Sequence, residues 1–139
     1  MLGVFAATFL AMAVPMAQSG DAQLVYSAED FETTVYFDYG RLDLGPAGIL
    51  LVEAVGERSL AAGFLKARVV GHTDKAGPED KNLEDGMRRA EAVAAVLIEA
   101  GFLPANIEIE SAGESEPVRR YEDDRREPLN RRAVITFSE

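Results

Sequence analysis

Residues 67–101 read ARVVGHTDKAGPEDKNLEDGMRRAEAVAAVLIEAG and predict a strand, a polar loop and a long helix in succession. The β-branched run ARVVG predicts the strand. We expect the helix to begin at Asn82, because Asn is a good N-cap and Asp85 follows near the positive end of the helix dipole. Gly101 ends the helix, because glycine favours the position just past the last helical turn.

The helix within this stretch is amphipathic, and Gly86 interrupts its second turn. Glycine at that place costs the helix about 1 kcal/mol relative to alanine. The apolar positions keep a helical period, and they are Met87, Ala90, Val93, Ala94, Leu97 and Ile98. One face of the helix is therefore expected to pack on a sheet.

Three further segments are rich in β-branched and aromatic residues or alternate in polarity, which predicts strands at 33–37, 107–110 and 133–137. Pro46, directly after Gly45, predicts the start of a second helix. The charged segment 113–130, which contains Pro117 and Pro128, predicts a long ordered loop or a short helix plus loop. The order β-α-β-α-β-β predicts a small α/β (α+β) sandwich, with one mixed sheet and both helices packed on one face.

Composition excludes several kinds of site. The chain has 139 residues, no cysteine and one histidine. Disulfides, thiol catalysis and a lipid-modified N-terminal cysteine are therefore excluded, as is a metal site built on several histidines. The formal net charge is -10, so we expect no nucleic-acid partner, because an acidic chain repels a polyanion. Neither a cofactor nor a metal ion is predicted.

The N-terminal segment differs from the rest of the chain. Residues 1–17 carry no charged side chain, and small residues follow the apolar run. This pattern predicts an export signal over residues 1–22, and the alternative is a retained N-terminal membrane anchor. A linker over residues 23–32 would then lead to a folded domain over residues 33–139. Either interpretation places the domain outside the cytoplasm.

Four separated segments carry a family pattern. The first is FDYG at 37–40, the third is GESEP at 113–117 and the fourth is REPLNRR at 126–132. The second begins with GHTD at 71–74 and continues through Gly77, Asn82, Arg89-Ala90 and Val93. In this order they resemble the OmpA C-terminal-like domains, the peptidoglycan-binding type found in OmpA, Pal and MotB. The chain departs from that pattern where the signature has Leu-Ser and this sequence has Asp85-Gly86, and where Arg41 replaces a common Ser.

The resemblance implies a ligand, the peptide stem of peptidoglycan, often through its diaminopimelate residue. That residue ends in a zwitterion, so its site needs an anion and a cation a few ångströms apart. Asp74 and Arg89 match the family's ligand-binding Asp and Arg. Arg89 can lean back toward the helix start and present its guanidinium to a carboxylate, which leaves Asp74 for the ammonium. The alternative is a salt bridge between Asp74 and Arg89 that binds nothing.

Further ligand-binding candidates are Thr73, Asn82, Arg131 and Asp38. Arg131 and Arg132 lie at the start of the last predicted strand and there point to opposite faces, so at most one faces the pocket, and the sequence does not choose between them. His72 is predicted to be structural. No catalytic residue is predicted: the carboxylates of Glu110 and Glu114 are present, but no motif selects them for glycan hydrolysis.

These residues together predict a non-catalytic domain that binds the peptidoglycan stem peptide in the periplasm and tethers the protein or its complex to the cell wall. Peptidoglycan is the expected partner, with outer-membrane or other envelope proteins as further candidates. The alternative is a membrane-anchored, partner-binding or motor-linked envelope module that retains its N-terminal helix. The mature N-terminal residue distinguishes the two interpretations.

Overall fold

A computed structural model describes residues 31–117 and 127–139. The predicted export signal or anchor and nearly all of the predicted linker lie outside the described residues. Part of the charged loop, residues 118–126, lies outside them as well. The described part begins at Phe31, and its first strand starts at Glu32, one residue before the predicted start.

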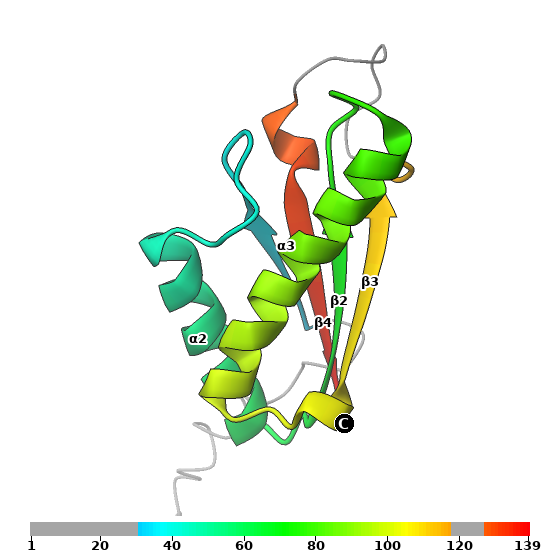
Figure 1. Cartoon of the computed structure of the whole chain (residues 1–139). Coiled ribbons are helices and arrows are strands. Elements are labelled where there is room, and N and C mark those ends of the chain that lie inside the picture. Colours follow the sequence, from blue (N-terminus) through cyan, green and yellow to red (C-terminus); the bar gives the residue numbers. More distant parts are fainter. Residues whose placement is uncertain (1–30, 118–126) are drawn as a thin grey trace, which may run out of the picture.

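One mixed four-stranded sheet forms the back of the domain (Figure 1). Its strands are β1 (Glu32–Tyr36), β2 (Lys66–His72), β3 (Ile107–Gly113) and β4 (Arg132–Ser138). The spatial order is β1-β4-β2-β3. The strands β2 and β3 run parallel, whereas β4 runs antiparallel to both β1 and β2. Both the first and the last strand of the chain therefore lie in the same half of the sheet.

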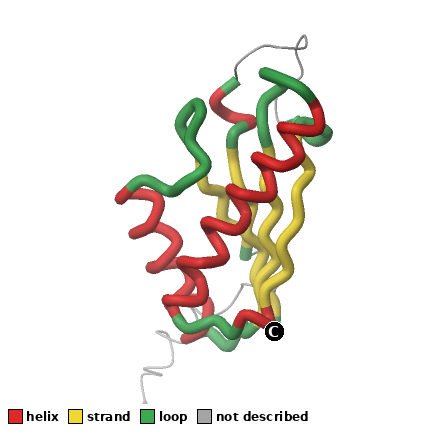
Figure 2. The backbone as a smooth tube through the Cα atoms, in the orientation of Figure 1, coloured by secondary structure: helices red, strands yellow, loops and turns green. Residues whose placement is uncertain are grey.

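Two helices, α2 (Pro46–Ala61) and α3 (Glu79–Ala100), cover one face of this sheet (Figures 1 and 2). Two short 3₁₀ turns, η2 (Pro104–Asn106) and η3 (Pro128–Asn130), precede β3 and β4. The predicted fold class is confirmed. In the described part of the chain, no helix has both the length and the apolar character needed to cross a membrane.

The core lies between the helices and the sheet. In β2 the alternation places Val69 inward and Arg68 outward, and β4 contributes Ile135 and Phe137 in the same way. The buried stripe of α3 includes Val93 and Leu97. This arrangement follows from the period of two in strands and 3.6 in helices.

The start of α3 differs from the prediction. The helix begins at Glu79, with Pro78 as its N-cap residue, three residues before Asn82. Gly77 adopts a positive φ of 90°, which turns the chain into the helix. Glu79 and Asp80 occupy the first turn, where acidic side chains are favoured by the helix dipole. The predicted end at Gly101 is confirmed, and Gly101 has the positive φ of 121° that such a cap requires.

Candidate functional site

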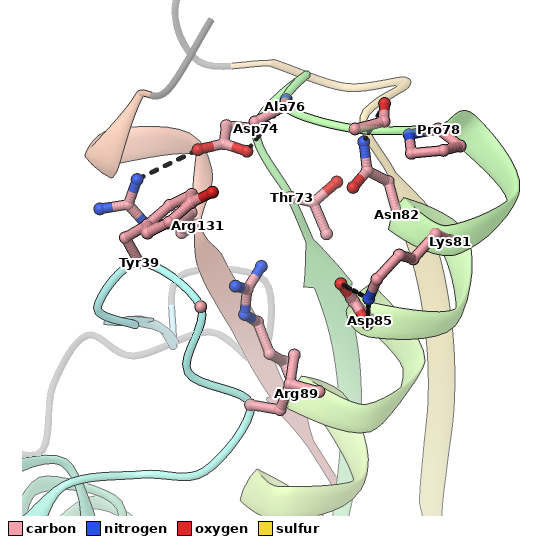
Figure 3. A pocket seen from close by; sticks show the side chains of 13 residues that line it. Tyr39, Thr73, Asp74, Ala76, Pro78, Lys81, Asn82, Asp85, Arg89 and Arg131 are labelled. Atoms are coloured by element: carbon pink, nitrogen blue, oxygen red, sulfur yellow. Dashed lines mark hydrogen bonds and ion pairs between the residues drawn. The ribbon is translucent and has the colours of Figure 1, made fainter. Parts of the chain in front are cut away.

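A cavity of about 400 Å³ lies where the loop after β2 meets the start of α3 (Figure 3). Its walls also come from the loop after β1 and from the residue that precedes β4. Five of the six predicted ligand-binding residues line this cavity, namely Thr73, Asp74, Asn82, Arg89 and Arg131. The fold therefore brings together residues as far apart in the sequence as Thr73 and Arg131.

Asp74 is buried, and its carboxylate is bound on both oxygens. The backbone N–H of Ala76 donates to Oδ1 (3.2 Å). The backbone N–H of Glu127 and the guanidinium of Arg131 donate to Oδ2, each at 3.1 Å. Within the described residues, Asp74 thus forms its ion pair with Arg131, and the alternative of a salt bridge to Arg89 is wrong. The sequence spacing could not reveal Arg131 as the partner, because it lies 57 residues away.

Arg89 is buried, yet it bonds to carbonyl groups rather than to a carboxylate. Its Nε donates to the Arg41 carbonyl oxygen (3.2 Å), and its Nη1 donates to the His72 carbonyl oxygen (3.1 Å). The guanidinium also lies over the ring of Phe37, at 5.4 Å from the centroid. Burial lowers the pKa of Arg89 from its ordinary value, and the nearby carboxylates of Asp85 and Asp74 act against that shift. A guanidinium stays charged under these conditions, so the cavity contains a buried cation.

Arg131 faces this cavity, and Arg132 faces the opposite side of the sheet. The Nε of Arg131 donates to the Phe37 carbonyl oxygen (3.2 Å), and its guanidinium lies over the Tyr39 ring, at 5.6 Å from the centroid. The guanidinium of Arg132 instead donates to the Glu116 carbonyl oxygen (3.0 Å). The structure thus answers a question that the sequence left open. Arg131 joins the loops after β1 and β2 and orients Asp74.

Asn82 and Thr73 occupy the wall between the β2 loop and α3. The side-chain amide of Asn82 donates to the Gly77 carbonyl oxygen (3.4 Å) and to the Glu114 carboxylate (3.3 Å). It is therefore not the N-cap, but it fixes the loop that precedes the helix. The hydroxyl of Thr73 is buried and has no hydrogen-bond partner in the part of the chain that the structure describes. A polar group of this kind beside a cavity is available to a ligand.

Asp38 lies apart from these residues. It lines a separate, smaller depression together with Tyr36 and Pro46, on the other side of the loop after β1. Its backbone carbonyl oxygen accepts from the N–H of Arg41 (3.0 Å), which closes the turn that carries the Arg41 carbonyl toward Arg89. The structure therefore does not bring Asp38 together with the other predicted site residues.

Among the lining residues that were not predicted as site residues, Tyr39, Lys81 and Asp85 carry side chains that can bond to a polar ligand. The Nζ of Lys81 donates to both carboxylate oxygens of Asp85, at 3.1 and 3.0 Å. The spacing of 81, 85 and 89 was a usable signal, because residues four apart share one face of a helix. The described residues contain no group of three or more His, Cys, Asp or Glu side chains that could hold a metal ion.

Residues 36–131 match the family model described as the OmpA family. The chain belongs to the OmpA family. Family membership confirms the resemblance seen in the four sequence segments. It also places the protein in the bacterial cell envelope, with this domain on the periplasmic side.

Relatives of this OmpA-family chain include peptidoglycan-associated lipoproteins. The one from Pseudomonas putida is 36% identical over 103 residues, which cover 74% of this chain and 61% of that protein. The one from Haemophilus influenzae is 31% identical over 126 residues, covering 87% of this chain and 82% of the relative. The crystal structure of the Burkholderia pseudomallei lipoprotein superposes with a TM-score of 0.68 at 28% identity, covering 76% of this chain and 89% of that one. The chain spans about three fifths of the length of the Pseudomonas relative.

Proposed function

We propose that the cavity beside α3 binds the zwitterionic end of a peptidoglycan stem peptide, of the diaminopimelate type, and that the domain thereby tethers the protein to the cell wall without catalysis. One observation carries the proposal. The buried guanidinium of Arg89 lines an open cavity, and within the described residues it hydrogen-bonds to carbonyl oxygens instead of a carboxylate. The names of the relatives, peptidoglycan-associated lipoproteins, point to the same ligand.

The carboxylate of the ligand is assigned to Arg89. A guanidinium has five N–H donors, and two hydrogen bonds leave donors available on the cavity side. A buried charge that lacks a close counter-ion is costly, so binding an anion there relieves part of that cost. Bidentate pairing of a guanidinium with a carboxylate also fixes the orientation of the ligand.

The ammonium of the ligand is assigned to Asp74. A carboxylate offers about four acceptor sites. Three N–H donors already bind the Asp74 carboxylate, two at Oδ2 and one at Oδ1. One acceptor site on Oδ1 therefore remains for an ammonium, and the Thr73 hydroxyl lies in the same wall. The existing hydrogen bonds hold the carboxylate in place before the ligand arrives.

Non-catalytic binding also agrees with the positions of the other carboxylates. Glu110 pairs with Arg68 on the sheet face that the helices do not cover, and Glu114 accepts from Asn82 at the rim. Glu110 and Glu114 therefore do not face each other across the cavity. We therefore assign the domain an anchoring role, in which other envelope proteins are candidates to share the anchor.

Co-sedimentation of the purified full chain with isolated peptidoglycan sacculi tests this proposal. Arg89→Met and Asp74→Asn should each weaken binding by about tenfold or more, the loss expected when a hydrogen-bonded charge is removed. Soluble diaminopimelate should compete with the wild-type chain. The matched control is Arg88→Met, because Arg88 is the exposed neighbour of Arg89 and pairs with Glu84 outside the cavity.

Urea denaturation of each variant separates loss of binding from loss of folding. Folded Arg89→Met that still sediments like the wild type would exclude Arg89 as the carboxylate site. A folded wild type that stays in the supernatant would contradict peptidoglycan binding altogether, and a protein partner would then be the better hypothesis.

A further inference from the structure

Three charged residues lie in a row along one face of α3. Lys81, Asp85 and Arg89 are spaced four residues apart, and all three line the cavity (Figure 3). Residues four apart are neighbours on a helix surface. The Asp85 carboxylate therefore lies between two cations and has two alternative partners on its own helix.

The structure pairs Asp85 with Lys81. Both carboxylate oxygens accept from the Lys81 ammonium, whereas Arg89 turns to the carbonyl oxygens of Arg41 and His72. Helix energetics alone favour the other pair, because an acid four residues before a base is the better orientation. A lysine in the first turn is also opposed by the helix dipole. Lys81 thus occupies a position that the stability of the helix does not favour.

The pairing of Asp85 with Lys81 leaves the positive charge of Arg89 available on the cavity side. The Asp85 side chain is 19% exposed, so its charge is only partly screened by solvent. If Asp85 turned to Arg89, it would occupy the same guanidinium N–H donors that a ligand carboxylate needs.

We propose that Lys81 is a positioning residue that sets the ligand preference of the cavity: it holds Asp85 and so leaves Arg89 available to the carboxylate of the ligand. The proposal rests on the proposed function, because it concerns the same cavity and the same zwitterion. A paired Asp85 favours a ligand with an ionised carboxyl group. An Asp85 released toward Arg89 favours a primary carboxamide, whose N–H can donate to Asp85 while its oxygen accepts from Arg89.

Calorimetric titration of the full chain with two stem tetrapeptides tests this proposal. The peptides differ only at the side-chain carboxyl group of diaminopimelate, which is ionised in one and a primary amide in the other. Lys81→Met should weaken binding of the acid by about threefold to tenfold, the range for a partly screened charge, and should change binding of the amide much less. Lys81→Arg keeps the cation and should retain the wild-type preference.

The double variant Lys81→Met, Asp85→Leu identifies the mechanism. It should recover the affinity for the acid peptide, because the competing carboxylate has gone. Arg88→Met removes the equivalent exposed pair with Glu84 on the same helix and should have no effect. The recovery is the informative result, since a merely structural role of Lys81 would not produce it.

Three results would overturn the proposal. Unchanged binding of the acid peptide by Lys81→Met would mean that Asp85 does not compete for Arg89. A double variant as weak as Lys81→Met would mean that Lys81 contacts the ligand directly. Failure of the wild-type chain to bind either peptide would overturn the proposed function together with this inference, and so differs from the first two results.

Discussion

Asp74 and Arg89 line the same cavity but hydrogen-bond to different partners. Asp74 pairs with Arg131, and Arg89 donates to two carbonyl oxygens. A direct pair between them would have to break before a zwitterion could bind, at a cost to affinity. The observed arrangement keeps an anion and a cation apart, which is the condition that a zwitterionic ligand requires.

His72 makes the stability of the domain depend on pH. It is the chain's one histidine, and its side chain lies beside Arg132 on the sheet face away from the helices. Burial and the positive charge of Arg132 lower the pKa of His72 to about 4. An unfolded chain binds this proton near pH 6.5, whereas the folded chain excludes it until the pH approaches 4. Stability should therefore fall as the pH decreases through this interval.

We expect His72→Gln to reduce this pH dependence. Between pH 7 and pH 5 the wild-type chain should lose about 1–2 kcal/mol more unfolding free energy than the variant. Urea denaturation of both proteins at the two pH values measures the difference. The carboxylates on the same face, Glu32, Glu110 and Glu116, are present in both proteins, so the comparison isolates the contribution of His72. Equal losses in the two proteins would show that His72 is not the responsible group.

At the scale of elements, α3 lies so close to the sheet that two glycines are required. A Cβ atom built on Gly71 of β2 would lie 1.7 Å from the Gly86 carbonyl oxygen. A Cβ atom built on Gly86 would lie 2.3 Å from Ser111 Oγ and 2.9 Å from the Gly71 carbonyl oxygen. Ser111 Oγ also donates to the Leu83 carbonyl oxygen (2.6 Å), which ties β3 to the same turn. This contact sets the distance between α3 and the loop after β2, across which the cavity forms.

Gly86→Ala should therefore destabilise the domain, although alanine favours a helix by about 1 kcal/mol over glycine. We expect a net loss of about 2 kcal/mol or more, because the added Cβ would displace the Ser111 hydroxyl from its hydrogen bond and would also press on the backbone carbonyl of Gly71. Urea denaturation measures the loss. The control is Gly48→Ala in α2, where the nearest atom to the added Cβ, at 3.0 Å, is the Cδ2 atom of the Leu44 side chain. A Gly86→Ala variant as stable as the wild type would mean that α3 can move away from the sheet without cost.

Local signals predicted most of these elements, and long-range contacts account for the errors. Pro46 and Gly101 correctly predicted one helix start and one helix end, since each acts through its own backbone geometry. Asn82 was wrongly predicted as a cap, because its side chain bonds to Glu114, 32 residues away. The sequence likewise could not show why residue 86 must be a glycine, because the close neighbours of Gly86, Gly71 and Ser111, belong to two other elements.

The same distinction holds for the candidate site. The family pattern predicted Asp74 and Arg89, and both line the cavity. The pairing of Asp74 with Arg131 and the placement of Asp38 in another depression depend on how the loops after β1 and β2 fold together. The spacing of residues within one segment contains no information on those contacts.

For the whole molecule, an aromatic cluster fixes the point where the chain enters the domain. The ring of Phe31 stacks on Phe64, with centroids 5.5 Å apart, and lies 5.2 Å from the ring of Phe137. The backbone N–H of Phe137 also donates to the Phe31 carbonyl oxygen (3.1 Å). The aromatic cluster thus joins the residue before β1 to the end of β4 and to the segment after α2. The predicted linker over residues 23–32 therefore includes a residue that packs on the core.

Two truncations should consequently differ in stability. Removal of residues 1–22, the predicted export signal, should leave the unfolding free energy unchanged, whereas removal of residues 1–32 should lower it by about 2–4 kcal/mol through loss of the Phe31 ring. Phe31→Ala in the full chain should reproduce most of this loss, and Phe31→Leu should reproduce less, because leucine keeps part of the apolar contact. Urea denaturation of the four chains measures these differences. Equal stability of the two truncated chains would show that the domain begins at Thr33 and that the contacts of Phe31 contribute little, since the packing of Phe102 on Phe137 would then suffice to close this end of the core.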